Sequence, residues 1–348
     1  MGGKYRSFVL IILITLCILL FYGCATYIEP WPIPGTSHSI QNVSDLKLLW
    51  SLENIYTEQD DFNPRMIANF GNVAFLGSLT QNPARNIIRL NGLNGNQIWL
   101  KTQDQERGYT NIITMSNDGL YIGNGGFPEI SKYAFCTGKN LWSQNLTGRG
   151  IGYIYMVGDQ VQISTDPFIF AILNADNGEL IQRKKGEDIF VIMTDETYIP
   201  GGMNELKAVN TSTGQLIWDI ELDHQLRLAP IFTDQIIFVR SGKVIGTVYA
   251  IDRNNGQEIW KTTDNIISNI ALASSGYLYV LTRDGELLEI NGTTGDASRE
   301  AFFSNSPFGL NGDIIAGGYE LAYDNSLNII YVLLGDSRQL FALQKFSK

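Results

Sequence analysis

The sequence has few of the side chains that build disulfide frameworks and metal sites. It contains only three cysteines, Cys17, Cys24 and Cys136, and two histidines, His38 and His224. Because Cys17 and Cys24 belong to an apolar N-terminal run, Cys136 is the one cysteine of the remaining chain, and we expect a semi-buried structural thiol there. The sequence therefore predicts neither a fold held together by several disulfides nor a zinc site of the CxxC type.

Charge and motifs exclude several further classes. The 35 acidic side chains outnumber the 25 basic ones, which gives a formal net charge of −10. Such a chain repels phosphate backbones, so we do not expect nucleic-acid binding. The nucleophile elbow GxSxG and the phosphate loop GxxxxGKS/T are both absent from the sequence. The segment Asp252–Glu258 (DRNNGQE) has oxygen ligands but is shorter than a twelve-residue calcium loop, so we interpret it as a hairpin turn.

The N-terminus has the parts of a secretory signal. Lys4 and Arg6 precede an apolar run at residues 8–22, which is shorter than the roughly 20 residues that span a bilayer. The ending FYGC resembles the bacterial lipoprotein box, which implies removal of residues 1–23 and lipid attachment at Cys24. An uncleaved membrane anchor is the alternative. Either way the body is expected outside the cytoplasm, and the inner and outer membranes are both compatible with this segment.

Two regions follow the signal. Residues 24–44 contain Pro30, Pro32 and Pro34, which oppose regular strand pairing and favour an extended tether. We assign residues 45–348 to a single domain.

That domain contains a repeat of about forty residues. Each unit has an apolar strand, a polar turn that ends in glycine, and a strand that often carries tryptophan four residues later. The turn glycines are Gly95, Gly138, Gly178, Gly214, Gly256 and Gly295, and the tryptophans are Trp50, Trp99, Trp142, Trp218 and Trp260. Glycine accepts the positive φ that such turns require. Two further strand runs lie between successive turns, so each unit is predicted to form a four-stranded propeller blade.

The pattern A-x-D/N-x-x-T/N-G-x-x-x-W resembles the repeat of pyrroloquinoline-quinone (PQQ) propellers, which also occurs in non-enzymatic lipoproteins. The units that end at Trp218 and Trp260 match it at every position. The second unit reads as shortened, because Ala134 stands only four residues before its glycine. The third and sixth units have Gln182 and Arg299 in place of tryptophan.

The number of turns predicts the number of blades. Six glycine turns give six hairpins, and a seventh third strand lies at residues 338–344 with no turn after it. The N-terminal strand LKLLWSLE has the character of a fourth strand without a third strand before it. Pairing these two strands would remove two exposed edges. We therefore predict an all-β, seven-bladed propeller of four-stranded antiparallel blades, closed by its N- and C-terminal strands.

Long connections are expected on one face of this ring, where fourth strands lead to the next first strands. They carry several arginines and aromatic residues, a composition typical of binding surfaces. This candidate binding rim comprises Arg65, Arg107, Tyr109, Arg149, His224, Arg227 and Phe308. A solvated loop face without a binding role is the alternative.

No catalytic residue or metal ligand can be assigned. The resemblance implies PQQ with Ca²⁺ for quinoprotein dehydrogenases, but these usually have eight blades and often a vicinal cysteine pair, which this chain lacks. The lipoprotein of the outer-membrane barrel-assembly machinery shares the anchor and the repeat, but it also usually has eight blades. We expect a membrane-anchored binding or scaffold protein of the cell envelope without a cofactor, with a protein or carbohydrate partner. A PQQ-dependent oxidoreductase and a polysaccharide-binding module are the alternatives.

The lipoprotein hypothesis predicts the behaviour of one variant. Cys24→Ala should release the protein from membranes or leave its precursor uncleaved, because the acyl chains supply the attachment. Membrane fractionation and N-terminal sequencing measure both outcomes. A mature N-terminus elsewhere, with unchanged membrane association, contradicts the hypothesis.

Overall fold

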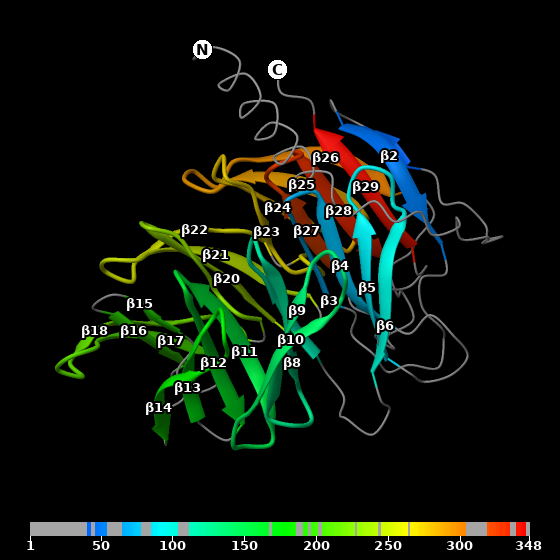
Figure 1. The fold of residues 1–348 in the computed structure, drawn as a ribbon. Helices are drawn as coiled ribbons and strands as arrows, with labels where there is room; N and C mark the ends of the chain where they lie inside the picture. The colour runs from blue at the N-terminus through cyan, green and yellow to red at the C-terminus, as the bar shows by residue number, and fades with distance from the viewer. Residues whose placement is uncertain are drawn as a thin grey trace, which may run out of the picture.

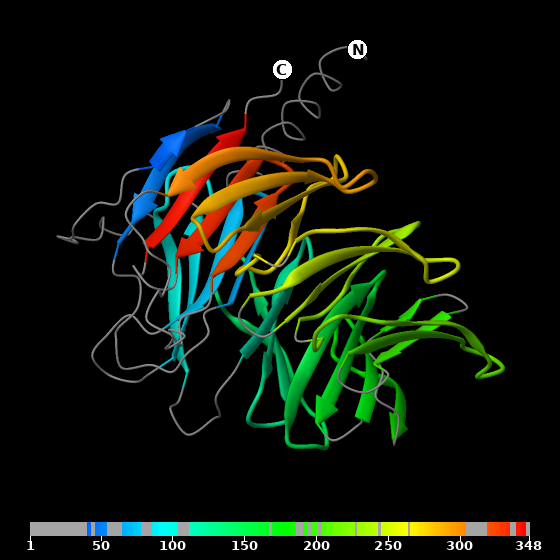
Figure 2. The same cartoon turned by 180° about the vertical axis from the view of Figure 1, so that it is seen from behind.

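The structure is a computed structural model. It describes residues 40–42, 46–53, 65–77, 85–103, 111–166, 169–185, 191–193, 196–200, 204–226, 228–242, 245–263, 265–303, 319–334 and 339–345. These residues form seven antiparallel sheets, arranged as the blades of a seven-bladed propeller (Figures 1 and 2). The predicted fold class is confirmed. No described residue belongs to a helix long and apolar enough to cross a membrane.

Blades 1 to 4 each contain four strands that are consecutive in the sequence. They are β3 (Arg65–Asn69), β4 (Asn72–Gly77), β5 (Arg85–Asn91) and β6 (Gln97–Gln103) in blade 1; β7 (Asn111–Met115), β8 (Gly119–Asn124), β9 (Glu129–Ala134) and β10 (Asn140–Asn145) in blade 2; β11 (Gly150–Val157), β12 (Gln160–Asp166), β13 (Ile169–Asn174) and β14 (Leu180–Lys185) in blade 3; and β15 (Val191–Met193), β16 (Glu196–Pro200), β17 (Glu205–Asn210) and β18 (Leu216–Glu221) in blade 4.

Blades 6 and 7 also take strands from the N-terminal part of the chain. The remaining strands are β19 (Ile231–Phe232), β20 (Ile236–Ser241), β21 (Thr247–Asp252) and β22 (Glu258–Lys261) in blade 5; β23 (Ala271–Leu272), β24 (Tyr277–Leu281), β25 (Glu286–Asn291), β26 (Ala297–Phe303) and β1 (Ile40–Asn42) in blade 6; and β27 (Glu320–Asp324), β28 (Ile329–Leu334), β29 (Gln339–Lys345) and β2 (Leu46–Leu52) in blade 7.

The ring closes through its terminal strands, as predicted. Strand β2 pairs antiparallel with β29, with Ser51 opposite Phe341 and Leu52 opposite Leu340. The two strands lie side by side in both views, β2 in blue and β29 in red (Figures 1 and 2). Blade 7 is therefore built from both ends of the chain: β2 covers the edge of β29 and itself forms the outer strand of the blade.

Blade 6 has a fifth strand that the sequence did not predict. Strand β1, at the end of the segment interpreted as a tether, pairs antiparallel with β26, with Ile40 opposite Phe303. The Ile40 side chain packs against a hydrophobic cluster that includes Leu287 of blade 6 and Leu343 of blade 7. The chain thus joins the propeller at the outer edge of blade 6.

The connections divide between two faces. On one face, called the loop face here, fourth-to-first and second-to-third connections meet, and the Gly242 N–H donates to the Gln225 carbonyl over 2.9 Å. On the opposite turn face, the Arg253 N–H in a glycine turn donates to the Gln235 carbonyl in a first-to-second turn over 2.9 Å. The two kinds of connection therefore lie on separate faces.

All six glycine turns adopt one conformation. Each turn glycine has φ between +63° and +78°, and its N–H bonds the carbonyl four residues earlier. An Asn or Asp at that earlier position accepts hydrogen bonds from backbone N–H groups in the turn, as Asp252 does from Asn254 (2.8 Å) and Asn255 (3.3 Å). This side chain explains the D/N of the repeat.

The prediction that the second unit is shortened was wrong. Its turn also closes with four-residue spacing, from the Gly138 N–H to the Ala134 carbonyl over 2.9 Å. Lys132 stands opposite Trp142, as Ala208 stands opposite Trp218 in blade 4. Ala134 therefore occupies the Asn/Asp position of the repeat, and Lys132 occupies the alanine position.

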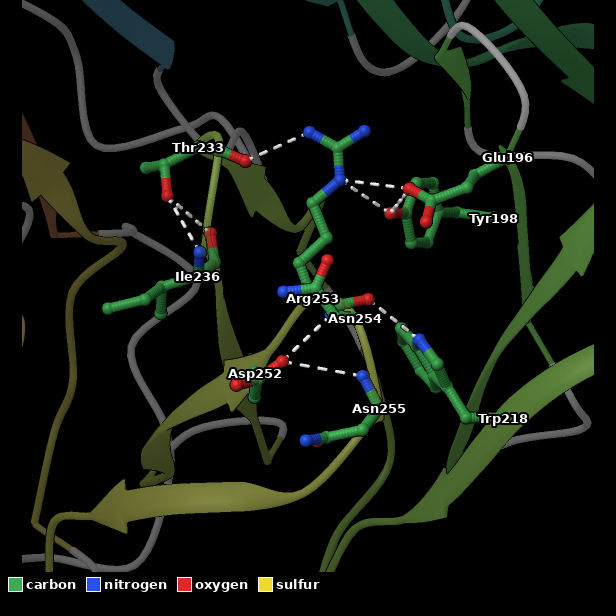
Figure 3. Close-up of polar contacts among 9 residues, drawn as sticks. All are labelled: Glu196, Tyr198, Trp218, Thr233, Ile236, Asp252, Arg253, Asn254 and Asn255. Atoms are coloured by element: carbon green, nitrogen blue, oxygen red, sulfur yellow. Dashed lines mark hydrogen bonds and ion pairs between the residues drawn. The ribbon is translucent and has the colours of Figure 1, made fainter.

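Each tryptophan packs on the glycine turn of the next blade. The indole N–H groups of Trp50, Trp99, Trp142, Trp218 and Trp260 donate over 2.6 to 3.2 Å to the carbonyl three residues before that glycine. Figure 3 shows the bond from Trp218 to the Arg253 carbonyl. A Cβ at any of these five glycines would lie 2.6 to 2.9 Å from the ring. Glycine is required there for close approach as well as for positive φ.

Cationic side chains strengthen three of these junctions. Lys132 is buried and donates to Asp118 over 2.5 Å and to the Ala175 carbonyl, the acceptor of Trp142, over 3.0 Å. Arg89 likewise donates to the Phe135 carbonyl, and burial lowers its pKa to about 10. In Figure 3, Arg253 of blade 5 reaches into blade 4, where its Nε donates to Glu196 (2.9 Å) and to Tyr198 (2.8 Å).

Two junctions lack a tryptophan. Gln182 stands on β14 in blade 3, and no atom lies within 4 Å of a Cβ built on Gly214 in the following blade. Arg299 stands on β26 in blade 6 and forms an ion pair with Glu286 of its own blade. Blade 3 therefore does not cover the next turn as the tryptophan-bearing blades do.

The expectation for Cys136 was wrong. Its side chain is exposed and disulfide-bonded rather than a semi-buried thiol. The other two cysteines, Cys17 and Cys24, lie outside the described residues, and signal removal with acylation of Cys24 would leave neither sulfur available to Cys136 in the mature protein. Cys136 lies in the turn between β9 and β10, which explains its exposure.

The two roles of the turn glycine can be separated by substitution. Gly214→Ala should cost about 1–2 kcal/mol, because only positive φ is strained there. Gly256→Ala should cost roughly 1–3 kcal/mol more, because its methyl group collides with the Trp218 ring. Urea unfolding measures both. In a Trp218→Ala background the two costs should become equal, and an equal cost in the unsubstituted protein would contradict the docking argument.

Candidate functional site: the central channel and the loop face

The central channel contains a cavity of about 450 Å³. Its walls come from the first strands or their approaches in blades 1, 2, 3, 5, 6 and 7, as expected for a propeller. Most of the lining is aliphatic or aromatic, including Met66, Ile113 and Ile154. The cavity has the size of a small-molecule site, and its few polar groups decide what it can do.

A buried carboxylate lies between two arginines. Glu320, the first residue of β27, accepts a hydrogen bond from Arg65 Nη1, the first residue of β3, over 2.9 Å. Burial raises the pKa of Glu320, whereas the charges of Arg65 and Arg240 lower it. The net shift is upward, so desolvation exceeds the attraction of both arginines. The Arg65–Glu320 pair joins blades 1 and 7 beside the channel.

The other polar groups also connect neighbouring blades. Arg240 is buried, and it donates to the carbonyls of Gly242 (2.8 Å) and Ile266 (3.1 Å). Burial lowers the pKa of Arg240 to about 10, which leaves it cationic at neutral pH. The Asn269 amide donates to the Leu321 carbonyl (3.0 Å) and accepts from the Leu321 N–H (2.6 Å). Arg240 thereby links blade 5 to blade 6, and Asn269 links blade 6 to blade 7.

A tyrosine links two non-adjacent blades. The Tyr155 hydroxyl on β11 donates to the Pro230 carbonyl over 3.2 Å, and its ring meets Phe232 edge-on with centroids 5.7 Å apart. Burial raises the pKa of this hydroxyl well above its ordinary value, so it stays protonated. Blades 3 and 5 therefore contact each other here, although blade 4 lies between them in the sequence.

The polar groups of the channel bond within the protein. Glu320 is ion-paired, and Arg240, Asn269 and Tyr155 bond to backbone groups. A general base or nucleophile would need hydrogen-bonding capacity directed at a substrate. Within the described ranges, no three His, Cys, Asp or Glu side chains form a group that could hold a metal ion.

The structure divides the predicted rim residues. Arg65 belongs to the channel wall rather than to an outer loop, because it begins β3 and pairs with Glu320. Arg149 and His224 are exposed in the connections from β10 to β11 and from β18 to β19, on the loop face. Arg107, Tyr109, Arg227 and Phe308 lie outside the described residues.

Sequence reasoning missed Glu320, Arg240 and Asn269. Each lies in or beside a strand that reads as apolar, such as IIFVRS for Arg240. A polar residue in or beside such a strand was the available signal. Its partners come from other blades, and sequence spacing does not show which residues meet there.

Comparisons with known proteins agree with this fold. The family model described as "Outer membrane protein assembly factor BamB" matches residues 83–188 and 171–312. BamB from Moraxella catarrhalis has a similar structure, with a TM-score of 0.51 at 14% identity over 86% of this chain and 99% of that one. A chain of the mitotic checkpoint complex reaches a TM-score of 0.65 at 9% identity, over 93% of this chain and 98% of that one.

One curated relative is an enzyme. The tetrathionate hydrolase of Acidithiobacillus ferrooxidans is 24% identical over 192 residues, which are 51% of this chain and 36% of the hydrolase. The chain therefore spans little more than a third of the length of that relative.

The buried ion pair predicts a pH-dependent loss of stability. Arg65→Met leaves Glu320 in the channel without its nearest cation, which raises the pKa of the carboxyl further above 4.5 in the folded state. The folded protein then binds this proton more tightly than the unfolded chain, so stability falls as pH rises from 4.5 through the folded pKa. We expect a loss of about 3 kcal/mol at pH 8 and a smaller loss at pH 5.

Urea unfolding at the two pH values measures this difference. Arg149→Met, which removes an exposed arginine of the loop face, is the matched control and should change stability little at either pH. Adding Glu320→Gln to Arg65→Met should remove the pH dependence. An equal loss at both pH values would contradict the assigned role of Glu320.

Proposed function

Because this chain belongs to the family of the outer membrane protein assembly factor BamB, a family of PQQ-like β-propellers, we propose that it is a lipid-anchored binding or scaffold protein of the cell envelope. In this role the ring is a rigid platform, and partners bind to its surfaces. The partners are proteins, as the name of the family suggests.

The use of the channel's polar groups carries this proposal. Glu320 and Arg65 join blades 7 and 1, Arg240 joins blades 5 and 6, and Asn269 joins blades 6 and 7. Their hydrogen bonds serve contacts between blades rather than a substrate. PQQ is a flat polyanion, and these described residues do not fit it, because the arginines are bonded within the protein and Glu320 adds negative charge. We therefore propose function without this cofactor.

The lipid anchor is part of the proposal. It is supported by the FYGC box and by strand β1, which attaches the following segment to blade 6. The residues between Cys24 and Ile40 can reach at most about 55 Å when fully extended. A lipidated Cys24 would therefore keep the edge of blade 6 near the membrane and leave the opposite side of the ring accessible.

The similarity to tetrathionate hydrolase does not favour an enzymatic function. It covers 36% of that enzyme, and the repeat itself produces similarity between propellers of different function.

One experiment separates a scaffold from a quinone enzyme. The full-length protein is solubilised from its own membranes in mild detergent and is analysed on native gels, and the purified protein is melted with and without PQQ and Ca²⁺. We expect a stoichiometric complex with another envelope protein and no change in Tm. Saturation at 100 times Kd would stabilise a true cofactor site by about 2.7 kcal/mol. A monomer on the native gel, or a Tm increase that requires both PQQ and Ca²⁺, would overturn the proposal.

A further inference from the structure

The two blades without a docking tryptophan differ in one respect. In blade 6, where Arg299 replaces tryptophan, the outer strand β26 is covered by β1. In blade 3, where Gln182 replaces it, no described strand pairs with the outer edge of β14. Blade 6 shows that this propeller accepts a fifth strand on a blade of this kind.

Blade 6 also shows how such a strand is held. Strand β1 runs antiparallel to β26, and Ile40 packs between blades 6 and 7, at a junction that has no docked indole. An outer strand presents a row of N–H and C=O groups that an added strand can satisfy. The same backbone groups are available along β14, whose residues 180–183 are exposed.

The start of β14 exposes two large apolar side chains. Leu180 and Ile181 are 42% and 54% exposed and stand next to each other. The corresponding strand β18 exposes a similar pair, Leu216 and Ile217, but it continues into Asp219 and Glu221 rather than into cations, and β10 and β22 each expose one large aliphatic residue. Since no tryptophan covers the turn at Gly214, an added strand could place an apolar side chain against that uncovered turn.

The end of β14 is basic. Arg183, Lys184 and Lys185 are consecutive, in a chain whose net charge is −10. No ion pair joins these three cations to a carboxylate of the described residues, whereas Lys132 and Lys261 are both ion-paired. A segment that pairs with β14 and complements its charge would carry acidic residues between apolar ones.

From these observations we propose that the outer edge of β14 is a docking site for an extended, acidic and apolar segment of a partner protein, which adds to blade 3 as a fifth strand. This inference rests on the proposed binding function and assigns its site. Main-chain hydrogen bonds hold the segment, Leu180 and Ile181 contact its apolar residues, and Arg183 and Lys185 contact its acidic ones.

The test uses a defined probe. The probe is an end-capped, fluorescent peptide in which glutamate and valine alternate over eight residues, titrated onto the full-length protein in detergent and followed by fluorescence anisotropy. We expect saturable binding. The same peptide with lysine in place of glutamate should not bind, and N-methylation of alternate amides, which removes the N–H donors of one edge, should abolish binding.

A matched pair of variants locates the site. Arg183→Glu combined with Lys185→Glu should weaken binding about tenfold or more, because each attraction becomes a repulsion. Lys47→Glu combined with Lys139→Glu makes the same change in net charge on the exposed surfaces of blades 7 and 2, and it should weaken binding less than about twofold. All four positions are exposed, so the Tm of both variants should match that of the unsubstituted protein.

Three results would overturn the inference: no saturable binding of the glutamate peptide, equal weakening by both pairs of variants, or undiminished binding of the N-methylated peptide. Binding of phosphatidylglycerol vesicles through β14, without binding of the peptide, would also overturn the inference. It would assign the basic strand to a lipid surface. A native complex that persists when the peptide fails would leave the scaffold function standing and remove only this site.

Discussion

The ring depends on one contact, the indole of a fourth strand on the glycine turn of the next blade. The indole ring packs on the glycine, which has no Cβ, and the indole N–H donates to the carbonyl three residues before that glycine. A single turn conformation places both groups. Trp50 of blade 7 makes this contact with Gly95 of blade 1, so the junction that closes the ring is packed in the same way as the other tryptophan junctions. The two chain ends are therefore packed together rather than only brought near each other.

The junctions without tryptophan are held by other contacts. Between blades 3 and 4, the Gln162 side chain donates to the Ile192 carbonyl and accepts from its N–H, each over 2.8 Å. Between blades 6 and 7, Tyr279 stacks on Tyr323 with centroids 5.3 Å apart, and Lys345 pairs with Glu289. These contacts hold the blades together but do not cover the outer turn in blade 4. The Gly214 turn therefore stays uncovered beside the edge of blade 3.

Polar groups beside the central channel also join neighbouring blades, closer to the axis of the ring. A buried carboxylate between two arginines is costly unless its hydrogen bonds are satisfied, and here they are satisfied by residues of other blades. The polar groups of the channel thus join blades to one another. This arrangement is consistent with a protein that presents a rigid ring to its partners.

The sequence by itself determined the repeat, the blade number and the closure, because positive φ and indole packing require particular residues at fixed spacing within one unit. It also determined the Asn/Asp position of the turn in most units. In blade 2 the sequence alone did not show that Ala134 occupies the Asn/Asp position and Lys132 the alanine position. Only the tertiary structure showed that Arg65 belongs to the channel, that Glu320 and Arg240 accompany it, and that β1 covers blade 6. Those contacts join residues up to 263 positions apart, as Ile40 and Phe303 are, and no local spacing encodes which of them meet.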